Sequence, residues 1–345
     1  MGANTYTQLL TQALSSVGQA VAVSDVNGQS VSGAELLQRI DSVAGLLCYL
    51  GLQPGDGLAQ LASNRLDAFA VMAGCLRAGI RYTPLHPLGS FEQQFHIVRD
   101  VKAKALVIDS QAFYEPGEKL ADAFSDLQVL TLSKADYGQY LIPLLDARSP
   151  PTFEPAGVDI AWVTYTGGTT GEPKGVVHTQ AGMAATAEIS TAAWEFPEQP
   201  HFLACSPISH AAGFLVLPVL RLGGKISLMP IFSPEALFEC VEKRGVDTLF
   251  LVPSMIYALL DHPEIERRDL SNLEHIIYAS APIAPDRLRE ALHVFGPILF
   301  QCYGQTESIH IASMARADHD PSITERLHSA GRATSGMSIA VLDTQ

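Results

Sequence analysis

The stretch Tyr165-Thr-Gly-Gly-Thr-Thr-Gly-Glu-Pro-Lys-Gly-Val176 is the most informative part of this sequence. It holds four glycines, three threonines, one proline and one lysine, and it comes just after the apolar run Ile160-Ala-Trp-Val163. Because glycines let backbone N–H groups converge on one point, such a stretch can cradle phosphate oxygens. Threonine hydroxyls add further donors, and Lys174 adds a mobile cation. The glycines taken alone also fit a flexible surface loop.

Two known glycine motifs fit this stretch less well. A Walker A loop ends in Gly-Lys-Ser/Thr, whereas Lys174 stands between Pro173 and Gly175. The elbow of α/β-hydrolases, Gly-x-Ser-x-Gly, would make Thr169 the nucleophile. That elbow turns directly into a helix, which Pro173 and Gly175 oppose. A hydrolase that uses Thr169 is therefore disfavoured.

Working outward, short apolar runs that fit strands alternate with amphipathic stretches that fit helices. Clear helix starts are Ser32-Gly-Ala-Glu35, which has the form of a capping box, and Ser233-Pro-Glu235, with proline in the first turn. The strand-like runs cover residues 21–23, 105–109, 129–132, 160–164, 202–205, 226–229, 248–252 and 276–279. The alternation predicts an α/β protein with mainly parallel sheets, and the number of strands predicts two sheets.

The composition limits the classes of partner. The chain has 345 residues, 47% of them hydrophobic, which predicts a large core and more than one lobe. Lys and Arg total 22 against 36 Asp and Glu, and the resulting formal net charge of -14 disfavours nucleic acid and anionic membranes as partners. The longest apolar run, residues 211–220, is shorter than the ~20 residues that span a bilayer. Five scattered cysteines and the lack of a signal peptide at the start lead us to expect a cytoplasmic protein.

The glycine-rich stretch resembles the phosphate loop of the adenylate-forming enzymes, which include acyl- and aryl-CoA synthetases, luciferases and nonribosomal adenylation domains. The family more often has serine where this chain has Gly167. Further segments resemble family motifs in the same order, so the resemblance covers essentially the whole chain. These segments are Pro207-Ile-Ser-His210-Ala-Ala-Gly213, Tyr278-Ala-Ser-Ala-Pro282, Gln301-Cys-Tyr-Gly-Gln-Thr-Glu307 and Ser329-Ala-Gly-Arg332.

The resemblance implies a reaction and a set of site residues. Such enzymes join a carboxylic acid to the AMP part of ATP and then let a thiol attack the mixed anhydride, so ATP, Mg²⁺ and coenzyme A are the implied cofactors. The residues implied to bind the nucleotide are Thr166, Gly167, Gly168, Thr169, Thr170, Gly171, Lys174, Ser280, Ala281, Pro282, Tyr303, Gly304, Gln305 and Thr306. Those implied to contact the acid are His210, Phe214 and Gly304, and Glu307 is the implied metal ligand. The implied catalytic residues are Thr166, Lys174, His210, Thr306 and Glu307.

The segment around His210 bears on which acid is used. Residues 201–225 contain no Asp or Glu. Family members that activate amino acids pair a carboxylate in this region with the substrate ammonium, and an unpaired buried ammonium would be costly. Amino acids are therefore disfavoured. We expect an apolar lining from His210, Ala211, Ala212, Phe214 and residues 253–256, which fits a fatty or aromatic acid.

The order of the motifs suggests a division of the chain. We expect one α/β lobe over residues 1–178 that ends in the phosphate loop, a second over residues 179–328, and the start of a β-barrel over residues 329–345, with a strand at 338–343. The family's ribose-binding aspartate, its hinge and its small C-terminal domain with an adenylating lysine have no counterpart here. The resemblance therefore implies an N-terminal fragment of low activity.

The leading hypothesis is an AMP-forming acyl-CoA synthetase cut to its large domain. An acyl-AMP ligase that loads a carrier protein shares the same motifs. A non-catalytic module that binds a nucleotide or an acyl group is the third possibility. The sequence carries no signal about the oligomeric state.

Overall fold

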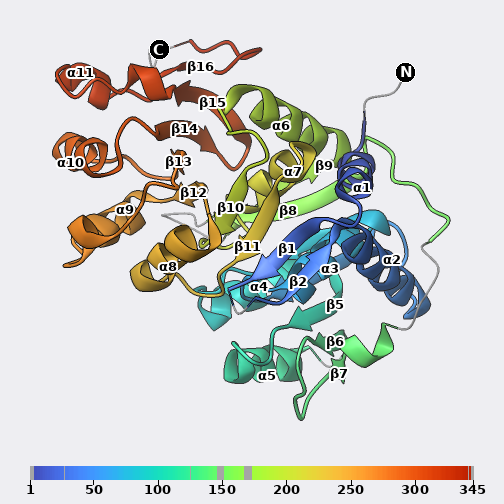
Figure 1. Ribbon diagram of the computed structural model, residues 1–345. Helices are drawn as coiled ribbons and strands as arrows, with labels where there is room; N and C mark the ends of the chain where they lie inside the picture. The colour runs from blue at the N-terminus through green and yellow to red at the C-terminus, as the bar shows by residue number, and fades with distance from the viewer. Residues whose placement is uncertain are drawn as a thin grey trace.

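The computed structural model describes residues 4–26, 28–124, 126–145, 151–166, 173–340 and 342. It contains two large sheets with helices packed around them (Figure 1). The helices are α1 (Tyr6–Val17), α2 (Gly33–Tyr49), α3 (Leu66–Arg77), α4 (Phe91–Asp100), α5 (Tyr114–Ala123), α6 (Gln180–Ala193), α7 (Gly213–Arg221), α8 (Pro234–Arg244), α9 (Pro253–Leu260), α10 (Pro285–Phe295) and α11 (Thr324–Leu327), with 3-10 helices η1 (Ile142–Leu144), η2 (Ile265–Arg267) and η3 (Arg316–Asp318). The prediction of an α/β protein with two mainly parallel sheets is confirmed.

One sheet has seven strands in the order β7-β6-β5-β3-β4-β8-β9. All of its neighbouring strands run parallel except β8 and β9, which form an antiparallel hairpin at one edge. Its strands are β3 (Gly57–Leu61), β4 (Arg81–Pro84), β5 (Ala103–Ile108), β6 (Gln128–Thr131), β7 (Gln139–Tyr140), β8 (Ile160–Thr166) and β9 (Lys174–Thr179). The β8–β9 hairpin thus carries the glycine-rich stretch, whose residues 167–172 lie outside the described part.

The other sheet has nine strands in the order β16-β15-β14-β13-β12-β10-β11-β1-β2. Its interior strands are parallel, and β2, β15 and β16 pair antiparallel at its two edges. Its strands are β1 (Val21–Asp25), β2 (Ser30–Ser32), β10 (His201–Ala204), β11 (Lys225–Leu228), β12 (Thr248–Leu251), β13 (His275–Tyr278), β14 (Leu299–Gln305), β15 (Ser308–Met314) and β16 (Arg332–Ala333).

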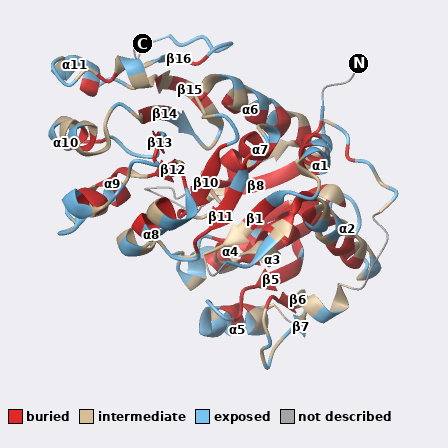
Figure 2. Ribbon diagram, in the orientation of Figure 1, coloured by how far each residue is buried: buried red, intermediate tan, exposed pale blue. Residues whose placement is uncertain are grey.

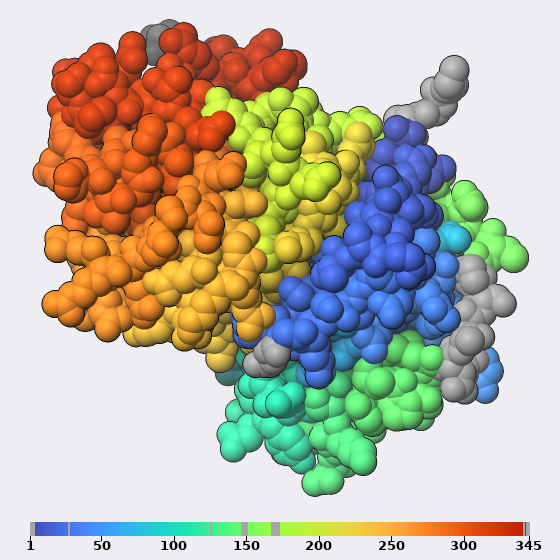
Figure 3. Space-filling view, viewed as in Figure 1, coloured from blue at the N-terminus to red at the C-terminus, as the bar shows by residue number. Residues whose placement is uncertain are grey.

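Sheet membership does not follow the expected lobe boundaries at the N-terminus. Strands β1 and β2 lie within residues 1–178, yet β1 pairs with β11 in the nine-stranded sheet, with Val23 opposite Ile226. Figure 3 shows the N-terminal segment, in blue, lying against the yellow segment that includes β11. Local sequence patterns identify a strand but not its partner, so this pairing is visible only in three dimensions. The division into lobes stays a prediction.

The prediction of a strand over residues 338–343 is wrong for the residues of this range that the structure describes. Residues 338–340 and 342 belong to no strand, and the side chains of residues 335–340 are exposed. An alternating pattern forms a stable strand only where one face can be buried, and these residues have no such face in this structure. The short strand β16 pairs with β15 instead, and the described residues form no closed barrel.

The local helix signals are confirmed. Ser32 caps α2 by accepting a hydrogen bond from the Glu35 N–H, and the Glu35 carboxylate accepts one from the Ser32 N–H, as a capping box requires. Ser233 caps α8, whose first residue is Pro234.

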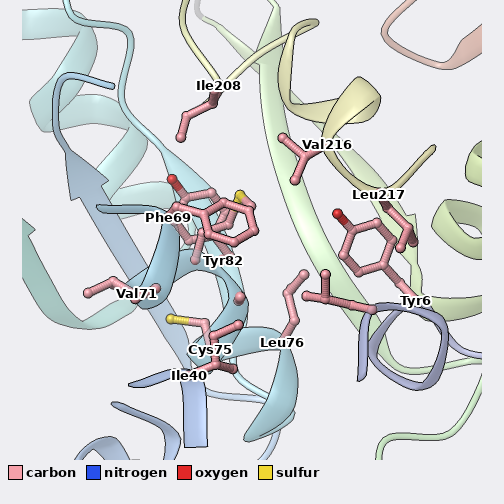
Figure 4. Close-up of a cluster of buried hydrophobic side chains, with 14 of the residues drawn as sticks. Tyr6, Ile40, Phe69, Val71, Cys75, Leu76, Tyr82, Ile208, Val216 and Leu217 are labelled. Carbon is pink, nitrogen blue, oxygen red and sulfur yellow. The ribbon is translucent and has the colours of Figure 1, made fainter. Parts of the chain in front are cut away.

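The core is continuous between the two sheets. Buried residues cluster on the central strands and the inner helix faces, while exposed ones lie on the outer faces of the helices (Figure 2). Figure 4 shows Tyr6, Phe69, Tyr82, Ile208 and Leu217 together in one such cluster. Because these residues come from α1, α3, β4, α7 and the segment after β10, the two sheets are packed as one body.

Within the described residues, none of the helices combines the length and the apolar character needed to span a lipid bilayer.

Two buried histidines make the fold sensitive to acid. Burial lowers the pKa of His275 to about 3 and that of His201 to about 4. Within the described part of the chain, neither ring nitrogen of His275 has a hydrogen-bond partner. An unfolded chain gives histidine a pKa of roughly 6.5. Since the folded pKa values are the lower ones, the unfolded state binds more protons below pH ~6.5. The stability present above that pH is therefore lost as the pH falls toward the folded values.

Replacing His275 by phenylalanine should reduce this acid sensitivity. Between pH 7.5 and pH 5.5, each such histidine should cost the protein ~1 kcal/mol of unfolding free energy, and His275→Phe should lose ~1 kcal/mol less than the wild type. Urea unfolding at the two pH values measures the difference. His293→Gln is the control, because His293 is exposed. An unchanged acid sensitivity in His275→Phe would contradict this account.

Candidate active site

A cavity of about 400 Å³ lies where the carboxyl ends of strands from both sheets meet. Ligands commonly bind at this edge of parallel sheets, because the loops that follow the strands gather there. Strand β8 supplies Thr164 and Thr166, and the β14–β15 hairpin supplies a second wall. The lining residues are Thr164, Thr166, Trp194, His210, Ala211, Phe214, Phe250, Ala279, Ser280, Cys302, Gly304, Gln305, Thr306, Glu307 and Ile309.

The structure brings Thr166 and Glu307 to the same cavity, although they are far apart in the sequence. Thr166 is the last residue of β8, and its hydroxyl donates to the backbone oxygen of Lys174 on β9 (3.4 Å). Lys174 is exposed at the start of β9. The predicted phosphate-binding residues Gly167, Gly168, Thr169, Thr170 and Gly171 lie outside the described residues, so their role stays a prediction.

Thr306 and Glu307 form the turn between β14 and β15, where Gln305 pairs with Ser308. Gly304 makes this tight hairpin possible. A Cβ atom at Gly304 would lie 2.6 Å from the carbonyl carbon of Ile309, 2.8 Å from the Ser308 oxygen, and closer still to the Ile309 oxygen. The hairpin therefore needs glycine at this position in order to present Thr306 and Glu307 to the cavity.

A second cavity of about 270 Å³ adjoins the first and shares Ser280, Cys302 and Gly304 with it. The sequence prediction placed Ser280, Ala281, Pro282 and Tyr303 around an adenine ring, and all four line this second cavity. Its full lining is Ser280, Ala281, Pro282, Ile283, Gln301, Cys302, Tyr303, Gly304, Leu327, His328, Ser329 and Ala330. Tyr303 is half-exposed, so its ring face is accessible to a ligand.

The segment between β10 and α7 carries His210 in a turn, before α7 begins at Gly213. The Ser209 hydroxyl lies 2.9 Å from Nδ1 of His210, and the His86 ring packs edge-to-face against the His210 ring with centroids 4.7 Å apart. Burial, together with the nearby His86, lowers the pKa of His210 to about 4. His210 is therefore neutral near pH 7, and a neutral imidazole has one N–H that can donate a hydrogen bond to a ligand oxygen.

The aromatic part of the cavity is held by packing. Phe214 stacks on Trp162 with ring centroids 5.4 Å apart and planes inclined by 16°. Trp194, Phe250 and Ile309 also line the cavity, and sequence reasoning missed them because single apolar residues carry no local functional signal. The expectation that Ala212 and residues 253–256 line the cavity was wrong. Ala212 is buried in the core instead, and α9 packs Met255 and Ile256 into the core of the nine-stranded sheet.

His178 on β9 was also missed. The negative charge of Glu307 raises its pKa, but burial is the larger effect and the pKa is lowered overall. Its ring packs edge-to-face against Phe214, 5.8 Å between centroids, and its Nε2 atom is buried without a hydrogen-bond partner in the described part of the chain. His178 thus packs against Phe214 and lies close enough to Glu307 to be influenced by its charge.

A family model described as AMP-binding enzyme matches residues 10–345. The chain belongs to this family. This chain is similar, over most of its own length, to a medium/long-chain-fatty-acid–CoA ligase, FadD8, of Mycobacterium tuberculosis. It is 36% identical over 330 residues, which make up 91% of this chain and 56% of that relative. The chain thus spans little more than half the length of this curated relative.

Solved structures of AMP-binding enzymes share the fold. The amide bond synthetase McbA of Marinactinospora thermotolerans superimposes with a TM-score of 0.87 at 29% identity, over 96% of this chain and 65% of that one. The N-terminal domain of FACL13 of Mycobacterium tuberculosis superimposes with a TM-score of 0.85 at 22% identity, over 96% of this chain and 83% of that one. The predicted membership of the adenylate-forming enzymes is confirmed, and the fold is that of their N-terminal domain.

Proposed function

We propose that this AMP-binding enzyme activates a carboxylic acid with ATP. The carboxylate attacks the α-phosphate and releases pyrophosphate, and the thiol of coenzyme A then attacks the resulting acyl-adenylate and releases AMP. The observation that carries the proposal is the shared cavity, whose lining includes Thr166, Thr306 and Glu307 together with His210 and Phe214. Activation requires a carboxylate and an α-phosphate, both anions, to be held in line with each other. Hydroxyl donors and an aromatic wall in one cavity support that arrangement.

Several of the predicted residues have a proposed role in this scheme. Thr306 would donate its hydroxyl to the α-phosphate, and Lys174 with the loop at 167–171 would follow the β- and γ-phosphates. Tyr303 would stack on the adenine ring beside the backbone of residues 280–282. His210, neutral near pH 7, would hydrogen-bond the substrate carboxylate and orient it toward the α-phosphorus.

Glu307 would hold Mg²⁺. Among the described residues, no group of three or more His, Cys, Asp and Glu side chains is arranged to bind a metal. Magnesium needs only one or two protein carboxylates and takes its other ligands from phosphate and water, so a single glutamate in the cavity fits this ion. When bound, Mg²⁺ would neutralise charge on the polyphosphate.

We propose a fatty or aromatic acid as the substrate. Ala211, Phe214, Phe250 and Ile309 give the cavity an apolar wall, which suits an apolar acyl group. Residues 201–225 contain no carboxylate to pair with a substrate ammonium. The similarity to a medium/long-chain-fatty-acid–CoA ligase supports the same class. A carrier-protein thiol is the alternative acceptor, because it offers the same nucleophile as coenzyme A.

The test is product formation by the purified protein. It is mixed with Mg·ATP and a panel of short, medium and long fatty acids and aromatic acids, and acyl-AMP is detected by mass spectrometry. Coenzyme A or a carrier protein is then added to identify the acceptor. An acyl-AMP that forms only with both ATP and an acid supports the proposal. ATP binding by calorimetry without an adenylate from any acid would favour a non-catalytic binding module instead.

A further inference from the structure

We propose that Asn64 is a positioning residue that fixes His210 and thereby contributes to the choice of acid. This inference rests on the proposed function, since it concerns the acid-binding side of the same cavity. Asn64 lies in the loop between α3 and β3, a strand of the seven-stranded sheet. His210 belongs to the segment that follows β10 in the other sheet.

The Asn64 side chain joins the two sheets by four hydrogen bonds. The two N–H groups on its Nδ2 atom are shared among three backbone oxygens at or just beyond the carboxyl ends of β10 and β11, and its Oδ1 atom accepts from the N–H of Ile208, two residues before His210. These bonds are to Ala204 O (2.9 Å), Ser206 O (2.8 Å), Met229 O (3.2 Å) and Ile208 N (2.8 Å). Asn64 is 4% exposed, so these hydrogen bonds are shielded from bulk water.

The neighbours of Asn64 fasten it to its own sheet. The Ser63 hydroxyl donates to Oδ2 of Asp109 (2.6 Å), and Nη1 of Arg65 donates to Oδ1 of the same carboxylate (2.9 Å). Asp109 follows β5 and is buried. Arg65 also donates to the Ser133 hydroxyl beyond β6 (3.1 Å). Ser63 and Arg65 thus hold one sheet while Asn64, between them, holds the other.

The path from Asn64 to His210 is short and tightly packed. Ile208 is buried and points toward the Phe69 and Tyr82 rings (Figure 4). The void left beside it is only about 10 Å³, which is about the smallest space that a water molecule needs. A displacement of the Ile208 backbone would therefore be passed on to His210 rather than absorbed.

Two turns close the segment around His210. The His210 N–H donates to Pro207 O (3.0 Å), and the Gly213 N–H donates to His210 O (2.9 Å). Gly213 packs so closely that a Cβ atom there would overlap the backbone oxygen of Ile208. The His86 ring, from the segment that follows β4, packs edge-to-face against the His210 ring.

This geometry predicts that a change at Asn64 affects binding of the acyl group and binding of the nucleotide to different extents. His210 and Ala211 belong to the segment that Asn64 holds, whereas Thr166, Thr306 and Glu307 are placed by β8 and the β14–β15 hairpin. Removing the Asn64 carboxamide should therefore weaken binding of the acyl group more than binding of AMP. A purely structural role would weaken both equally.

The experiment compares AMP with non-hydrolysable acyl-sulfamoyl adenosines of several chain lengths, by calorimetry on the purified protein. The ratio of the two dissociation constants reports the acyl contribution. In Asn64→Ala, this contribution should fall about tenfold, as expected for the loss of one buried hydrogen-bond network, and the preferred chain length should change. The AMP affinity should stay within about twofold of the wild type, as expected when distant interactions are independent.

Asn272→Ala is the control with the same substitution, because Asn272 also donates its amide to a backbone oxygen, that of Val241 (2.9 Å), outside the cavity lining. If Asn64→Ala does not fold, Ile208→Val tests the same segment and should show a smaller loss in the same direction. An unchanged acyl contribution in a folded variant, or equal losses for AMP and the acyl group, overturns the inference. A wild-type protein that binds neither ligand refutes the proposed function itself.

Discussion

Replacing Gly304 by alanine should remove nucleotide and acid binding together. The new Cβ atom would overlap backbone atoms of Ile309 and Ser308, which cannot rotate away as a side chain can. Overpacking of this kind typically costs ~1–3 kcal/mol or more. Here the clash is with the backbone of β15, so we expect the β14–β15 hairpin to open in order to remove it. Because Gly304 lines both cavities and the hairpin presents Thr306 and Glu307, we expect affinities for Mg·ATP and for an acyl-sulfamoyl adenosine to fall by ~100-fold or more.

Calorimetry with both ligands measures this effect, and circular dichroism establishes whether the variant is folded. Gly182→Ala is the control, since its nearest neighbour would be the Thr179 side-chain hydroxyl at 3.2 Å, the cap of α6, with no backbone atom as close as those at Gly304. A folded Gly304→Ala protein that binds both ligands as the wild type does would show that the hairpin geometry is unimportant.

Replacing Glu307 by glutamine should abolish most of the magnesium dependence of ATP binding. The amide keeps the size of the side chain but removes the negative charge that we propose for the metal ligand. Hydrogen bonds and contacts to charged groups contribute ~1.5–3 kcal/mol, so the affinity for Mg·ATP should fall by ~10- to 100-fold. With magnesium removed by a chelator, Glu307→Gln should bind ATP at least as well as the wild type, because the carboxylate then only repels the polyphosphate.

The comparison is made by calorimetry across a magnesium titration. Glu325→Gln serves as the control, because Glu325 is an exposed acid on α11. If Glu307→Gln retains the full magnesium dependence, the metal ligand lies elsewhere in the protein.

Local sequence signals predicted the elements of this fold because they depend on near neighbours in the chain. The capping box at Ser32 and the cap at Ser233 with Pro234 are examples, since each is complete within four residues. The strand-like runs likewise became strands of two mainly parallel sheets. The partner of each strand was not predictable, and β1 shows why: its register with β11 depends on a segment about 200 residues away.

The candidate site divides in the same way. The motif residues Thr306, Glu307 and His210 were identified from the resemblance, and the structure places all three on one cavity. Trp194 and Phe250 were not identified, because they enter the cavity only through the pairing and packing of β12 and α6 with other elements. The roles of the motif residues stay predictions.

The position of β1 has a consequence for how the polypeptide is made. Its partner β11 leaves the ribosome only after about 200 further residues have been synthesised, which takes roughly 10–40 s. During that interval the edge of β1 that will pair with β11, in the blue segment of Figure 3, stays unpaired in the nascent chain and must not pair with another chain. A gene split after residue 178 would leave β11 without its β1 neighbour in the C-terminal half, so two such halves should regain a complete sheet only by complementing each other.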